Sequence, residues 1–399
     1  MRILFVCHRF PYPPKRGGKI RPFNIVKHFH ENGHKVTVAS VARNKAEALE
    51  GSGIEAYCES YHVETIGILA AVGRMLWRLP QSTPSSLGNF FSPQLARTIK
   101  SLIQTQKFDL VFVHCSSAAQ YVEWIADTPK VLDFGDIDSQ KWLIYANKRR
   151  LPLSLGYWLE GTKLQREEKR LAHRFDLCTC TTRAELETFD DFNTGVSSGW
   201  YPNGVDTAYF SPTDEPYDPF TICFVGRMDY YPNQEAMINF CAKVLPNILS
   251  AEPKVELKIV GANPSAAIKR LGRLASVTVT GSVLDVRPYV TRSALTVAPL
   301  SIARGTQNKI LESMAMGVPV IASHEAAGGV DAIPGEHILV GESDADICDK
   351  TLRLLRNPDE RKKLSIAGLN RVLSNHNWSN SMRMLDTLLA EHFPGVTEL

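Results

Sequence analysis

The sequence lacks the cysteine pattern of a metal centre or a disulfide framework. Its eight cysteines are scattered along the chain, with no CxxC pair and no clustered histidines beside them. Several stand inside apolar, strand-like runs, which is typical of reduced core residues in a cytosolic protein. The cysteines therefore predict neither a zinc site nor a disulfide framework.

A long apolar run and a strong net charge are also absent. No apolar stretch reaches the length of a membrane-spanning helix, and the strand-like run 2–7 follows Met1 directly, which leaves no room for a signal peptide. We expect a cytoplasmic protein. The net charge of +3 across 399 residues is too small to indicate nucleic acid as a general partner.

What the chain has is length and a repeated alternation of strands and helices. Its 399 residues exceed what one hydrophobic core usually serves, and its 44% hydrophobic content is ordinary for a globular protein. Two series of alternating segments are separated by the Pro- and Asn-Gly-rich stretch 201–212. The sequence thus predicts an α/β fold of two doubly wound, Rossmann-like domains, 1–205 and 206–377, facing one another across a cleft.

The most informative stretch is 294–323, ALTVAPLSIARGTQNKILESMAMGVPVIAS. Apolar, β-branched runs at 294–299 and 318–322 predict strands, and the segment 309–316 between them predicts a short helix. This is a βαβ unit of a parallel sheet. Free backbone N–H groups and the positive end of the helix dipole should therefore point out of the carboxyl edge of the sheet, where phosphates bind.

Side chains suited to a sugar nucleotide stand at the start of this predicted helix. Gly305, Thr306 and Asn308 lie where the loop turns into the helix. Lys309 stands in the first turn and Glu312 follows one turn later on the same face, which offers a cation for a diphosphate and a carboxylate for sugar hydroxyls. The alternative is an ordinary solvated pair on a surface helix; the Gly-Thr-x-Asn start and the Gly-Val-Pro end favour the binding site.

The loop after the first predicted strand holds a glycine pair. Gly17 and Gly18 stand among the cations Lys15 and Arg16, ahead of a helix that we expect to begin near Ile20. Glycines at the carboxyl end of a first strand let a backbone approach a ligand closely, and neighbouring cations suit an anionic one. A tight turn without a ligand is an equally good interpretation.

Polar residues also follow two later strands, 109–114 and 130–134. His114 ends the first of them, and Asp136 and Asp138 follow the second. In an open α/β sheet these strand ends face the ligand crevice, so the three side chains are candidates for contacting a sugar or an acceptor hydroxyl. Capping of the next helix is the alternative for the two aspartates, and it is the preferred one for Asp138.

Two further segments bear on partners. The stretch 66–80 is apolar, with Arg74 and Arg78 on its flank, and suits either a core or a membrane surface. Burial in a core is the preferred interpretation. The stretch 147–174 is a basic helical segment interrupted at Pro152, whose charges favour anionic partners unless they are simply solvated.

Several motifs resemble one protein family along almost the whole chain. They are NGVD at 203–206, FVGRMD at 224–229, LKIVGANP at 257–264, the block G-x-x-NK-x-LESMAMGVPVIAS at 305–323, and the closing helix opened by Trp378. They are similar to those of nucleotide-sugar glycosyltransferases of the GT-B fold, in the large retaining family 4. The segments CHRFPYPPKRGGKIR, DFGDIDSQKW and GRMDYYPN resemble most the bacterial sugar transferases of PEP-CTERM/exosortase exopolysaccharide systems.

The resemblance implies roles for individual residues. Glu312 would accept hydrogen bonds from the nucleotide ribose, while Lys309 and Arg227 neutralise the donor diphosphate and Asp136 acts at the reacting sugar. The closing helix, 378–399, would return to the first domain. The other implied donor contacts are Gly305, Thr306 and Asn308 at the sugar or its phosphates, Gly17 and Gly18 from the first domain, and the backbone around Gly261, Ser282 and Val283 at the base.

Three positions depart from the family pattern. Arg304 stands where the family usually has a second glutamate, Pro232 where it has a helper lysine, and Gly135-Asp136 where it often has His-Asp. These changes concern the sugar side of the site more than the nucleotide side. Arg304, with His114 and Asp138, would meet the donor sugar or the acceptor.

The activity implied by the resemblance is transfer of a sugar, with retention, from a nucleoside diphosphate sugar to a hydroxyl of a glycan or lipid-linked acceptor. Exopolysaccharide or cell-surface glycan synthesis is the expected setting. No metal ion is expected, since GT-B enzymes use side chains and a helix dipole at the leaving group. A nucleotide-sugar epimerase or hydrolase, or a non-catalytic binding protein, remains an alternative. The location would be cytoplasmic, with peripheral contact to the inner membrane as a further option.

Overall fold

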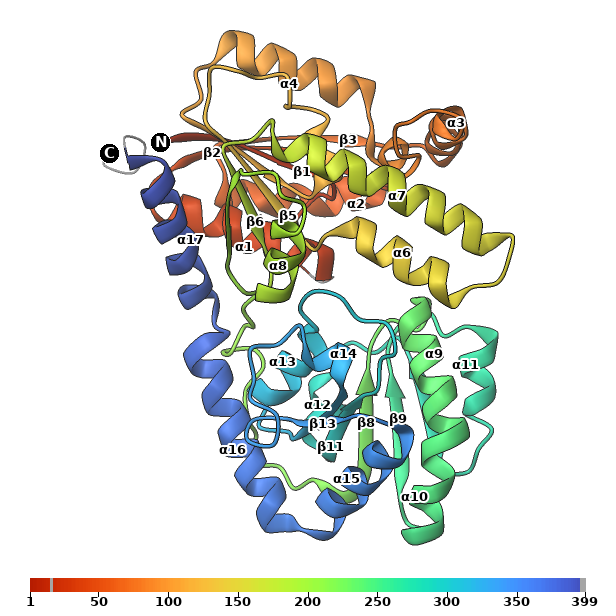
Figure 1. Cartoon of the computed structure of the whole chain (residues 1–399). Coiled ribbons are helices and arrows are strands. Elements are labelled where there is room, and N and C mark those ends of the chain that lie inside the picture. Colours follow the sequence, from red (N-terminus) through yellow and green to blue (C-terminus); the bar gives the residue numbers. More distant parts are fainter. Residues whose placement is uncertain (15–16, 395–399) are drawn as a thin grey trace. The chain divides into compact units, whose positions relative to one another are not determined.

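The computed structural model describes residues 1–14 and 17–394, which divide into two compact units. The first is Met1–Pro202 together with the chain from Met382 onward, and the second is Asn203–Ser381. Lys15 and Arg16, the cations predicted beside the glycine pair, lie outside the described residues, as does the end of the predicted segment 378–399. Each unit is an α/β layer structure built on one parallel sheet (Figure 1).

The sheet of the first unit has seven strands in the order β3-β2-β1-β4-β5-β6-β7, and every neighbouring pair is parallel. Its strands read as continuous apolar runs because helices cover both faces. The strands are β1 (Arg2–Cys7), β2 (Lys35–Ala42), β3 (Ser60–Thr65), β4 (Leu110–His114), β5 (Lys130–Gly135), β6 (Leu177–Cys180) and β7 (Ser197–Trp200).

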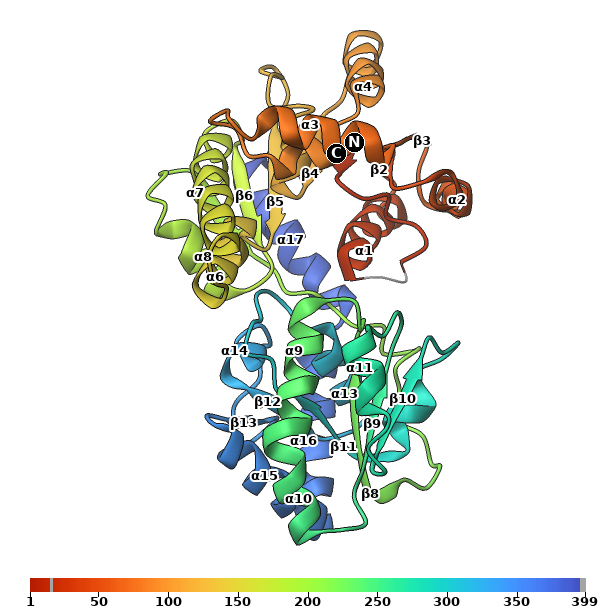
Figure 2. The ribbon, with the colours of Figure 1, turned by 90° about the vertical axis from the view of Figure 1, so that its right-hand side faces the viewer.

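Helices of the first unit connect these strands, and Figure 2 shows them from the side. The apolar stripe of α4, with Leu95 and Ile99, packs in one core with Leu4 and Val113 of the sheet. The helices are α1 (Gly17–Glu31), α2 (Lys45–Glu50), α3 (Ile68–Arg78), α4 (Pro93–Thr105), α5 (Ser116–Ala119), α6 (Asp138–Lys148), α7 (Leu153–Ala172) and α8 (Arg183–Asp190), with 3₁₀ turns η1 (Gly51–Tyr57) and η2 (Ser86–Phe90).

The second unit has a six-stranded parallel sheet in the order β10-β9-β8-β11-β12-β13. The chain crosses from one side of β8 to the other after β10, so β8 and β11 lie at the point where the strand order reverses. Ligands bind at such a point in open α/β sheets. The strands are β8 (Asp218–Val225), β9 (Glu256–Val260), β10 (Val277–Gly281), β11 (Ser293–Ala298), β12 (Val320–Ser323) and β13 (Leu339–Gly341).

The helices of the second unit bury one apolar face each against this sheet. Ile310, Leu311 and Met314 of α13, for example, share a core with Leu295 and Ile321 of the strands beside it. The helices are α9 (Tyr231–Asn239), the π-helical turn η3 (Phe240–Val244), α10 (Leu245–Ala251), α11 (Ala266–Leu271), α12 (Arg287–Thr291), α13 (Asn308–Ala315), α14 (His324–Ala327), α15 (Asp344–Arg356) and α16 (Pro358–Asn375). The last helix, α17 (Trp378–His392), begins in the second unit and belongs to the first from Met382 onward.

The predicted fold class, two Rossmann-like domains, is confirmed. All eight cysteines are buried and unpaired, as their apolar surroundings predicted. Two short strands were not predicted, β7 and β13, because four or three residues carry too little periodicity. The first helix begins at Gly17 instead of near Ile20, so the glycine pair opens the helix and does not form a loop.

The preferred interpretation of the stretch 66–80 as core is wrong. Its residues form α3, in which Ala71 is the one buried side chain, whereas Leu69 and Trp77 are 89% and 75% exposed. Hydrophobic periodicity identifies the apolar face of a helix but does not say what that face contacts. Within the described residues, none of the helices combines the length and the apolar character needed to cross a bilayer.

Candidate functional site

The loop between β11 and α13 is shaped by a close backbone contact. Gly305 has a φ of +62°, in the left-handed region that favours glycine. A Cβ placed on Gly329 would lie 1.8 Å from the carbonyl oxygen of Gly305. Only glycine therefore allows the loop and the segment after α14 to approach so closely, and this packing fixes the start of α13.

Polar atoms at the start of α13 lack partners. Thr306 Oγ1 and Asn308 Oδ1 are buried without a hydrogen-bond partner among the described residues. The preceding residue, Gln307, provides no side-chain cap, and its amide instead donates to the carbonyl oxygen of Arg304 at 3.2 Å. An unmade buried hydrogen bond typically costs ~1–3 kcal/mol, so these atoms are suited to the polar groups of a ligand.

Lys309 stands in the first turn of α13 and points back toward the end of β8. Its Nζ donates to Asn233 Oδ1 at 2.6 Å and lies 4.5 Å from the centre of the Phe224 ring. Burial lowers the pKa of Lys309 to about 7, with the nearby Glu312 carboxylate opposing that change. A bound anion would favour the charged form of this lysine.

Glu312 follows one turn later on the same helix. Burial raises the pKa of Glu312 to about 7, and the charge of Lys309 opposes the rise only in part. Two ionisable groups whose pKa values are displaced toward neutrality from opposite sides, on one helix face at a sheet edge, are typical of a binding or catalytic site. The sequence prediction that these two residues lie together at this edge agrees with the structure.

Asn233 is a site residue that the sequence interpretation missed. Its Nδ2 donates to the carbonyl oxygen of Arg227 at 2.9 Å while its Oδ1 holds Lys309. It directly follows Pro232, the position where the family resemblance implies a lysine. Lys309 of α13 therefore places a cation beside the loop after β8. The sequence did offer one signal for Asn233: it is an amide side chain next to position 232, where the family resemblance implies a functional lysine.

Arg227 lies in the loop after β8 but its guanidinium is engaged. Nε donates to Asp229 Oδ1 at 3.0 Å, and both side chains are 41% exposed. Asn263 Nδ2 donates to the same carboxylate at 3.3 Å, and the hydrogen bond from Arg227 leads the causes that lower the pKa of Asp229. A diphosphate would therefore have to replace Asp229 as the partner of Arg227.

The residues predicted to meet a nucleotide base lie at the ends of β9 and β10. A Cβ on Gly261 would lie 1.9 Å from the carbonyl oxygen of Gly226, so glycine is required where the ends of β8 and β9 meet. Ser282 is exposed, and Val283 packs against a small apolar cluster that includes Val260. Their backbone is thus placed at the carboxyl edge of the sheet, as predicted.

His114, in the first unit, belongs to a buried polar network. Its Nδ1 lies 2.7 Å from Asp133 Oδ2, and the same carboxylate receives Arg21 Nη2 at 2.8 Å and Thr179 Oγ1 at 2.9 Å. Desolvation, the largest single cause, would raise the pKa of the fully buried Asp133, but the charges and hydrogen bonds of Arg21 and His114 together outweigh it and hold the pKa of Asp133 well below its usual range. One ring nitrogen of His114 is therefore committed to Asp133.

A pocket of about 280 Å³ lies at the carboxyl ends of β1, β4 and β5. Asp138 lines it and accepts from Cys115 Sγ at 3.5 Å; it makes no capping bond to α6, so the preferred capping interpretation is wrong. Burial, the leading cause, raises the pKa of Asp138. Asp136 is exposed and accepts from Thr181 Oγ1 at 2.8 Å.

Two residues of this pocket were not predicted. His8 Nδ1 and Arg9 Nε are buried without hydrogen-bond partners among the described residues. Burial lowers the pKa of His8 well below its usual value, and the charge of Arg9 adds to the effect. Both directly follow β1, and their place at a strand end was the signal available. Gly18, in the exposed first turn of α1, is close by: a Cβ on it would lie 3.5 Å from Arg9 Cδ.

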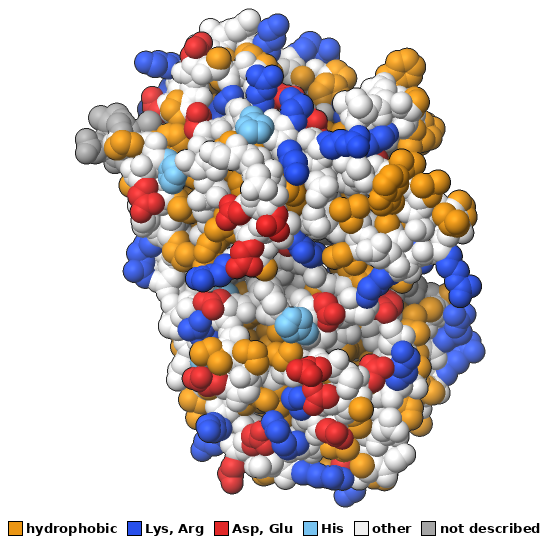
Figure 3. Space-filling view, viewed as in Figure 1, with side chains coloured by type: hydrophobic (Ala, Val, Ile, Leu, Met, Phe, Trp, Pro, Cys, Tyr) orange, Lys and Arg blue, Asp and Glu red, His pale blue; other side chains and the backbone are white. Residues whose placement is uncertain are grey.

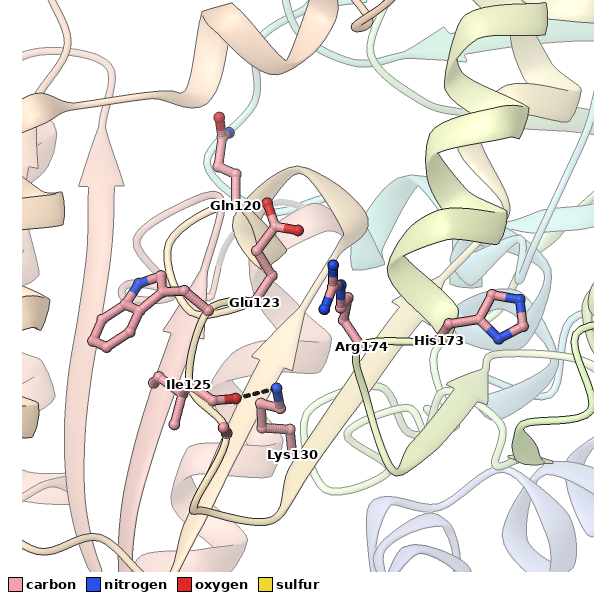
Figure 4. A pocket seen from close by; sticks show the side chains of 8 residues that line it. Gln120, Glu123, Ile125, Lys130, His173 and Arg174 are labelled. Atoms are coloured by element: carbon pink, nitrogen blue, oxygen red, sulfur yellow. Dashed lines mark hydrogen bonds between the residues drawn. The ribbon is translucent and has the colours of Figure 1, made fainter.

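A second pocket, of about 490 Å³, lies at the opposite edge of the same sheet, where β5 begins (Figure 4). Two of its charged groups, Lys130 and Glu123, already have protein partners. Lys130 Nζ donates to the carbonyl oxygen of Ile125, and Glu123 forms an ion pair with Arg170 at 2.7 Å. This edge of a parallel sheet is also not the one at which ligands bind. We therefore assign the pocket no ligand.

Comparison with known proteins points to one kind of domain. Residues 219–357 match the family described as glycosyl transferases group 1. A GDP-mannose-dependent monoacylated alpha-(1-6)-phosphatidylinositol monomannoside mannosyltransferase of Corynebacterium glutamicum is 25% identical over 252 residues, which cover 55% of this chain and 64% of that protein. An uncharacterized 44.6 kDa protein in the cps region of Klebsiella pneumoniae is 18% identical, covering 98% of this chain and all of the other.

The fold of almost the whole chain is similar to that of a protein solved in complex with UDP-glucose. HepE of Anabaena, solved with UDP-glucose, superposes with a TM-score of 0.68 at 15% identity, covering 98% of this chain and 100% of that one. At this identity the likeness concerns the fold alone. The segment 219–357 that matches the family contains Arg227, Gly261, Lys309 and Glu312. Residues 219–357 thus resemble a glycosyl transferases group 1 domain, and they lie within a fold of two Rossmann-like units.

Proposed function

We propose that this protein is a glycosyltransferase that moves a sugar from a nucleoside diphosphate sugar to a hydroxyl of a glycan or lipid-linked acceptor. The observation that carries the proposal is the start of α13. Buried polar atoms without partners, at Thr306 and Asn308, stand beside a lysine and a glutamate whose pKa values are both about 7. A donor that brings a diphosphate and sugar hydroxyls would satisfy all four groups.

The donor's diphosphate would be held from two elements. Lys309 approaches from α13, and Arg227 from the loop after β8, where it exchanges Asp229 for the phosphate. Backbone amides at the start of α13, together with Gly305 and Thr306, add the positive end of the helix dipole. Glu312 accepts from the ribose hydroxyls. UDP and GDP are the first probes, since the similar proteins named above use UDP-glucose and GDP-mannose.

The proposed chemistry is an exchange of one C1–O bond for another on the same face of the sugar. The bond from C1 to the diphosphate breaks as the acceptor hydroxyl oxygen attaches to C1, and the acceptor proton passes to the departing phosphate oxygen. Negative charge grows on the diphosphate in the transition state, so fixed donors beside it lower the barrier. One such donor is typically worth ~3 kcal/mol.

The acceptor would be received by the pocket of the first unit. Its lining combines Asp138 with the buried nitrogens of His8 and Arg9, which suits a hydroxyl-bearing group with some negative charge. Asp136, exposed at the same strand end, is proposed to act at the reacting sugar. His114, fixed by Asp133, would present its other ring nitrogen.

Arg304 is proposed to recognise an anionic or strongly hydrogen-bonding donor sugar, or the acceptor's phosphate. A guanidinium offers a planar fork suited to carboxylate or phosphate. Arg304→Glu restores the charge usual in the resembled family, so its preferences should change on a panel of donors and lipid-linked acceptors. Preferences unchanged on both panels would show that Arg304 contacts neither substrate.

The setting proposed is cell-surface or exopolysaccharide synthesis on the cytoplasmic side of the membrane. A similar Klebsiella protein is encoded in the cps region, and the similar Corynebacterium protein acts on a phosphatidylinositol mannoside. We propose that transfer is retaining and needs no metal ion. Product stereochemistry by NMR, and turnover after chelation with EDTA, test these two points.

A thermal-shift screen across nucleoside diphosphates is the first experiment. A ligand at a hundred times its Kd stabilises by ~2.7 kcal/mol, so the correct diphosphate gives a clear rise in Tm. Lys309→Met should reduce that rise without abolishing it, and Lys243→Met, an exposed control, should keep it unchanged. Turnover assays follow with donor alone and with acceptors. Donor consumption without acceptor would indicate a hydrolase or epimerase, and tight binding without any turnover a binding protein.

A further inference from the structure

Exposed hydrophobic side chains are concentrated in two segments of the first unit. Of the 22 large hydrophobic side chains that are exposed in the described chain, eleven lie within 68–79 and 151–159. Scattered single residues of this kind are normal on a protein surface, but a concentrated group marks an interaction site. We call these two segments together the α3–α7 surface.

The outward face of α3 is its apolar face. Leu69, Val72, Leu76 and Leu79 are spaced by three, four and three residues, which places them on one side of the helix, and all four are exposed. The opposite side packs on η2, where Arg74 Nε donates to the carbonyl oxygen of Gly88 at 3.0 Å. The helix is therefore held from behind and presents its hydrophobic stripe outward.

The beginning of α7 continues this surface. Its exposed hydrophobic side chains are Leu153, Leu155, Trp158 and Leu159, with Leu151 just before the helix. The two segments are joined by direct contacts: Lys163 Nζ donates to the carbonyl oxygen of Leu79 at 2.7 Å, and Glu160 accepts from the backbone of Ser85 and Ser86. The space-filling view shows hydrophobic side chains gathered over α3 and the outer ends of α6 and α7, with basic side chains beside them (Figure 3).

The two segments of this surface carry basic side chains and no acidic ones. The sequence contains no aspartate or glutamate in 65–108 or in 139–159. The cations within these ranges include Arg74 and Arg78, half-buried on α3, and Arg150, exposed between α6 and α7. An apolar face whose own segments carry cations and no carboxylates complements an anionic lipid surface, to which each nearby cation adds a roughly fivefold attraction, or ~1 kcal/mol.

We propose that the α3–α7 surface docks on an anionic phospholipid bilayer. α3 lies in the plane of the headgroups with Leu69, Leu76 and Leu79 at the acyl boundary, and the cations meet lipid phosphates. With 11 residues the helix is about 16 Å long at 1.5 Å per residue, far too short to span the membrane. The contact is therefore peripheral.

This docking would also place the acceptor pocket beside the membrane. The pocket is lined on one side by Leu87 and Phe90 of η2 and on the other by Trp142 and Tyr145 of α6 and Leu164 of α7. Of these elements, α7 carries part of the α3–α7 surface, η2 packs on α3, and α6 packs on α7. A lipid-linked acceptor could thus enter from the bilayer, a consequence that rests on the proposed glycosyltransferase function, whereas the docking itself does not.

Vesicle flotation with the full chain tests the docking. The protein should float with vesicles of phosphatidylcholine and phosphatidylglycerol (3:1) at low salt and remain in solution with phosphatidylcholine alone. A triple variant, Leu69→Ser with Leu76→Ser and Leu79→Ser, should lose at least tenfold in vesicle partitioning. The matched control changes three exposed residues of the second unit, Leu274→Ser, Ile366→Ser and Leu373→Ser, and should partition like the wild type.

The electrostatic part has its own variant and readout. Arg150→Ala should weaken partitioning roughly fivefold at low salt and less at high salt. Nucleoside diphosphate shifts in Tm should be unchanged in all these variants, so a failure of docking is distinguishable from a failure of the proposed function. Absence of wild-type flotation, or equal loss in the control triple variant, would overturn the proposal. So would a change confined to self-association in sedimentation, which would make a second copy the occupant.

Discussion

The two units each contain a partly or fully buried cation and carboxylate, and they treat the pair in opposite ways. In the first unit, Arg21 and Asp133 are joined by two hydrogen bonds of 2.9 and 2.8 Å, with His114 and Thr179 completing the shell. The pKa of Arg21 is raised and that of Asp133 lowered: burial is the largest single cause in each case, but the charges and hydrogen bonds of the neighbouring groups together outweigh it. Both groups are held firmly in their charged forms.

In the second unit the balance is reversed. The pKa of Lys309 is lowered and that of Glu312 raised, both to about 7, because burial outweighs their mutual attraction. A pair whose hydrogen bonds are complete within the protein stabilises the fold. A pair whose charges are insufficiently compensated is poised for a ligand that completes it, at some expense of stability.

The largest expected effect is on the complete pair. Asp133→Ala leaves Arg21 buried without its counter-charge, which typically destabilises by ~3–5 kcal/mol. Urea unfolding of the full chain should show the first transition at clearly lower denaturant. Asp136→Ala, which removes an exposed carboxylate just after β5, is the matched control and should change little. Equal transitions in the two variants would contradict the structural role assigned to Asp133.

Lys309→Met should leave folding intact but impair turnover. The negative charge that Lys309 contacts grows in the transition state, so the variant should raise the activation barrier by ~3 kcal/mol and lower kcat roughly a hundredfold. The affinity for the donor should fall by a smaller factor. Arg227→Ala should follow the same pattern. The measurement is kcat and KM for each variant. A rise in KM with kcat unchanged would mean that these cations hold the donor only in its ground state.

Glu312→Ala should weaken nucleotide binding by ~1.5–3 kcal/mol, the range for hydrogen bonds to a charged group. Calorimetry with the preferred nucleoside diphosphate and with its 2′,3′-dideoxy analogue makes the test specific. The wild type should discriminate between the two ligands, and the variant should not. Discrimination retained in the variant would remove Glu312 from the ribose site.

The smallest expected effect is the pH dependence of stability. Lys309 has its pKa lowered from 10.5 to about 7, so above pH 7 the unfolded chain binds more protons and stability rises with pH. Glu312 has its pKa raised from 4.5 to about 7, so stability falls as pH rises toward 7. The contribution of this pair to the stability of the fold is therefore lowest near pH 7. The contribution of Arg21 and Asp133 to stability is lost only in acid.

The double variant Lys309→Met with Glu312→Gln should remove that minimum. We expect a gain of ~1 kcal/mol at pH 7, or roughly 2–4 °C in Tm, and less at pH 5 or pH 9.5. Thermal melts at the three pH values measure it. A gain that is equal at all three values would show that the two groups do not titrate near neutrality.

Local spacing in the sequence was enough to predict the core of the candidate site. The βαβ unit, and Lys309 and Glu312 on one helix face, depend on neighbours within four residues, and the structure has them as predicted. Asn233 was missed because its contact with Lys309 joins residues 76 positions apart. Likewise, the engagement of Arg227 by Asp229 depends on side-chain geometry that spacing does not determine.

The sequence also did not show whether the apolar face of a helix is buried or exposed. The sequence marked 66–80 as an apolar stretch with Arg74 and Arg78 on its flank, but its burial depends on whether another element covers it, which the local sequence does not encode. His8 and Arg9 were missed for a similar reason, since their burial without partners arises from the walls that η2, α6 and α7 add around them. Long-range packing decides both.

The amide of Asn233 has a consequence for how tightly a donor can be held. A lysine side chain loses ~1.5–2 kcal/mol of rotamer entropy when it is fixed in one conformation. Lys309 is already fixed, by Asn233 Oδ1 at 2.6 Å and by the ring of Phe224. That ordering takes place when the chain folds, so it does not have to be repeated when an anion arrives. The ammonium group is in this sense preorganised, and the attraction it exerts is available to binding almost undiminished.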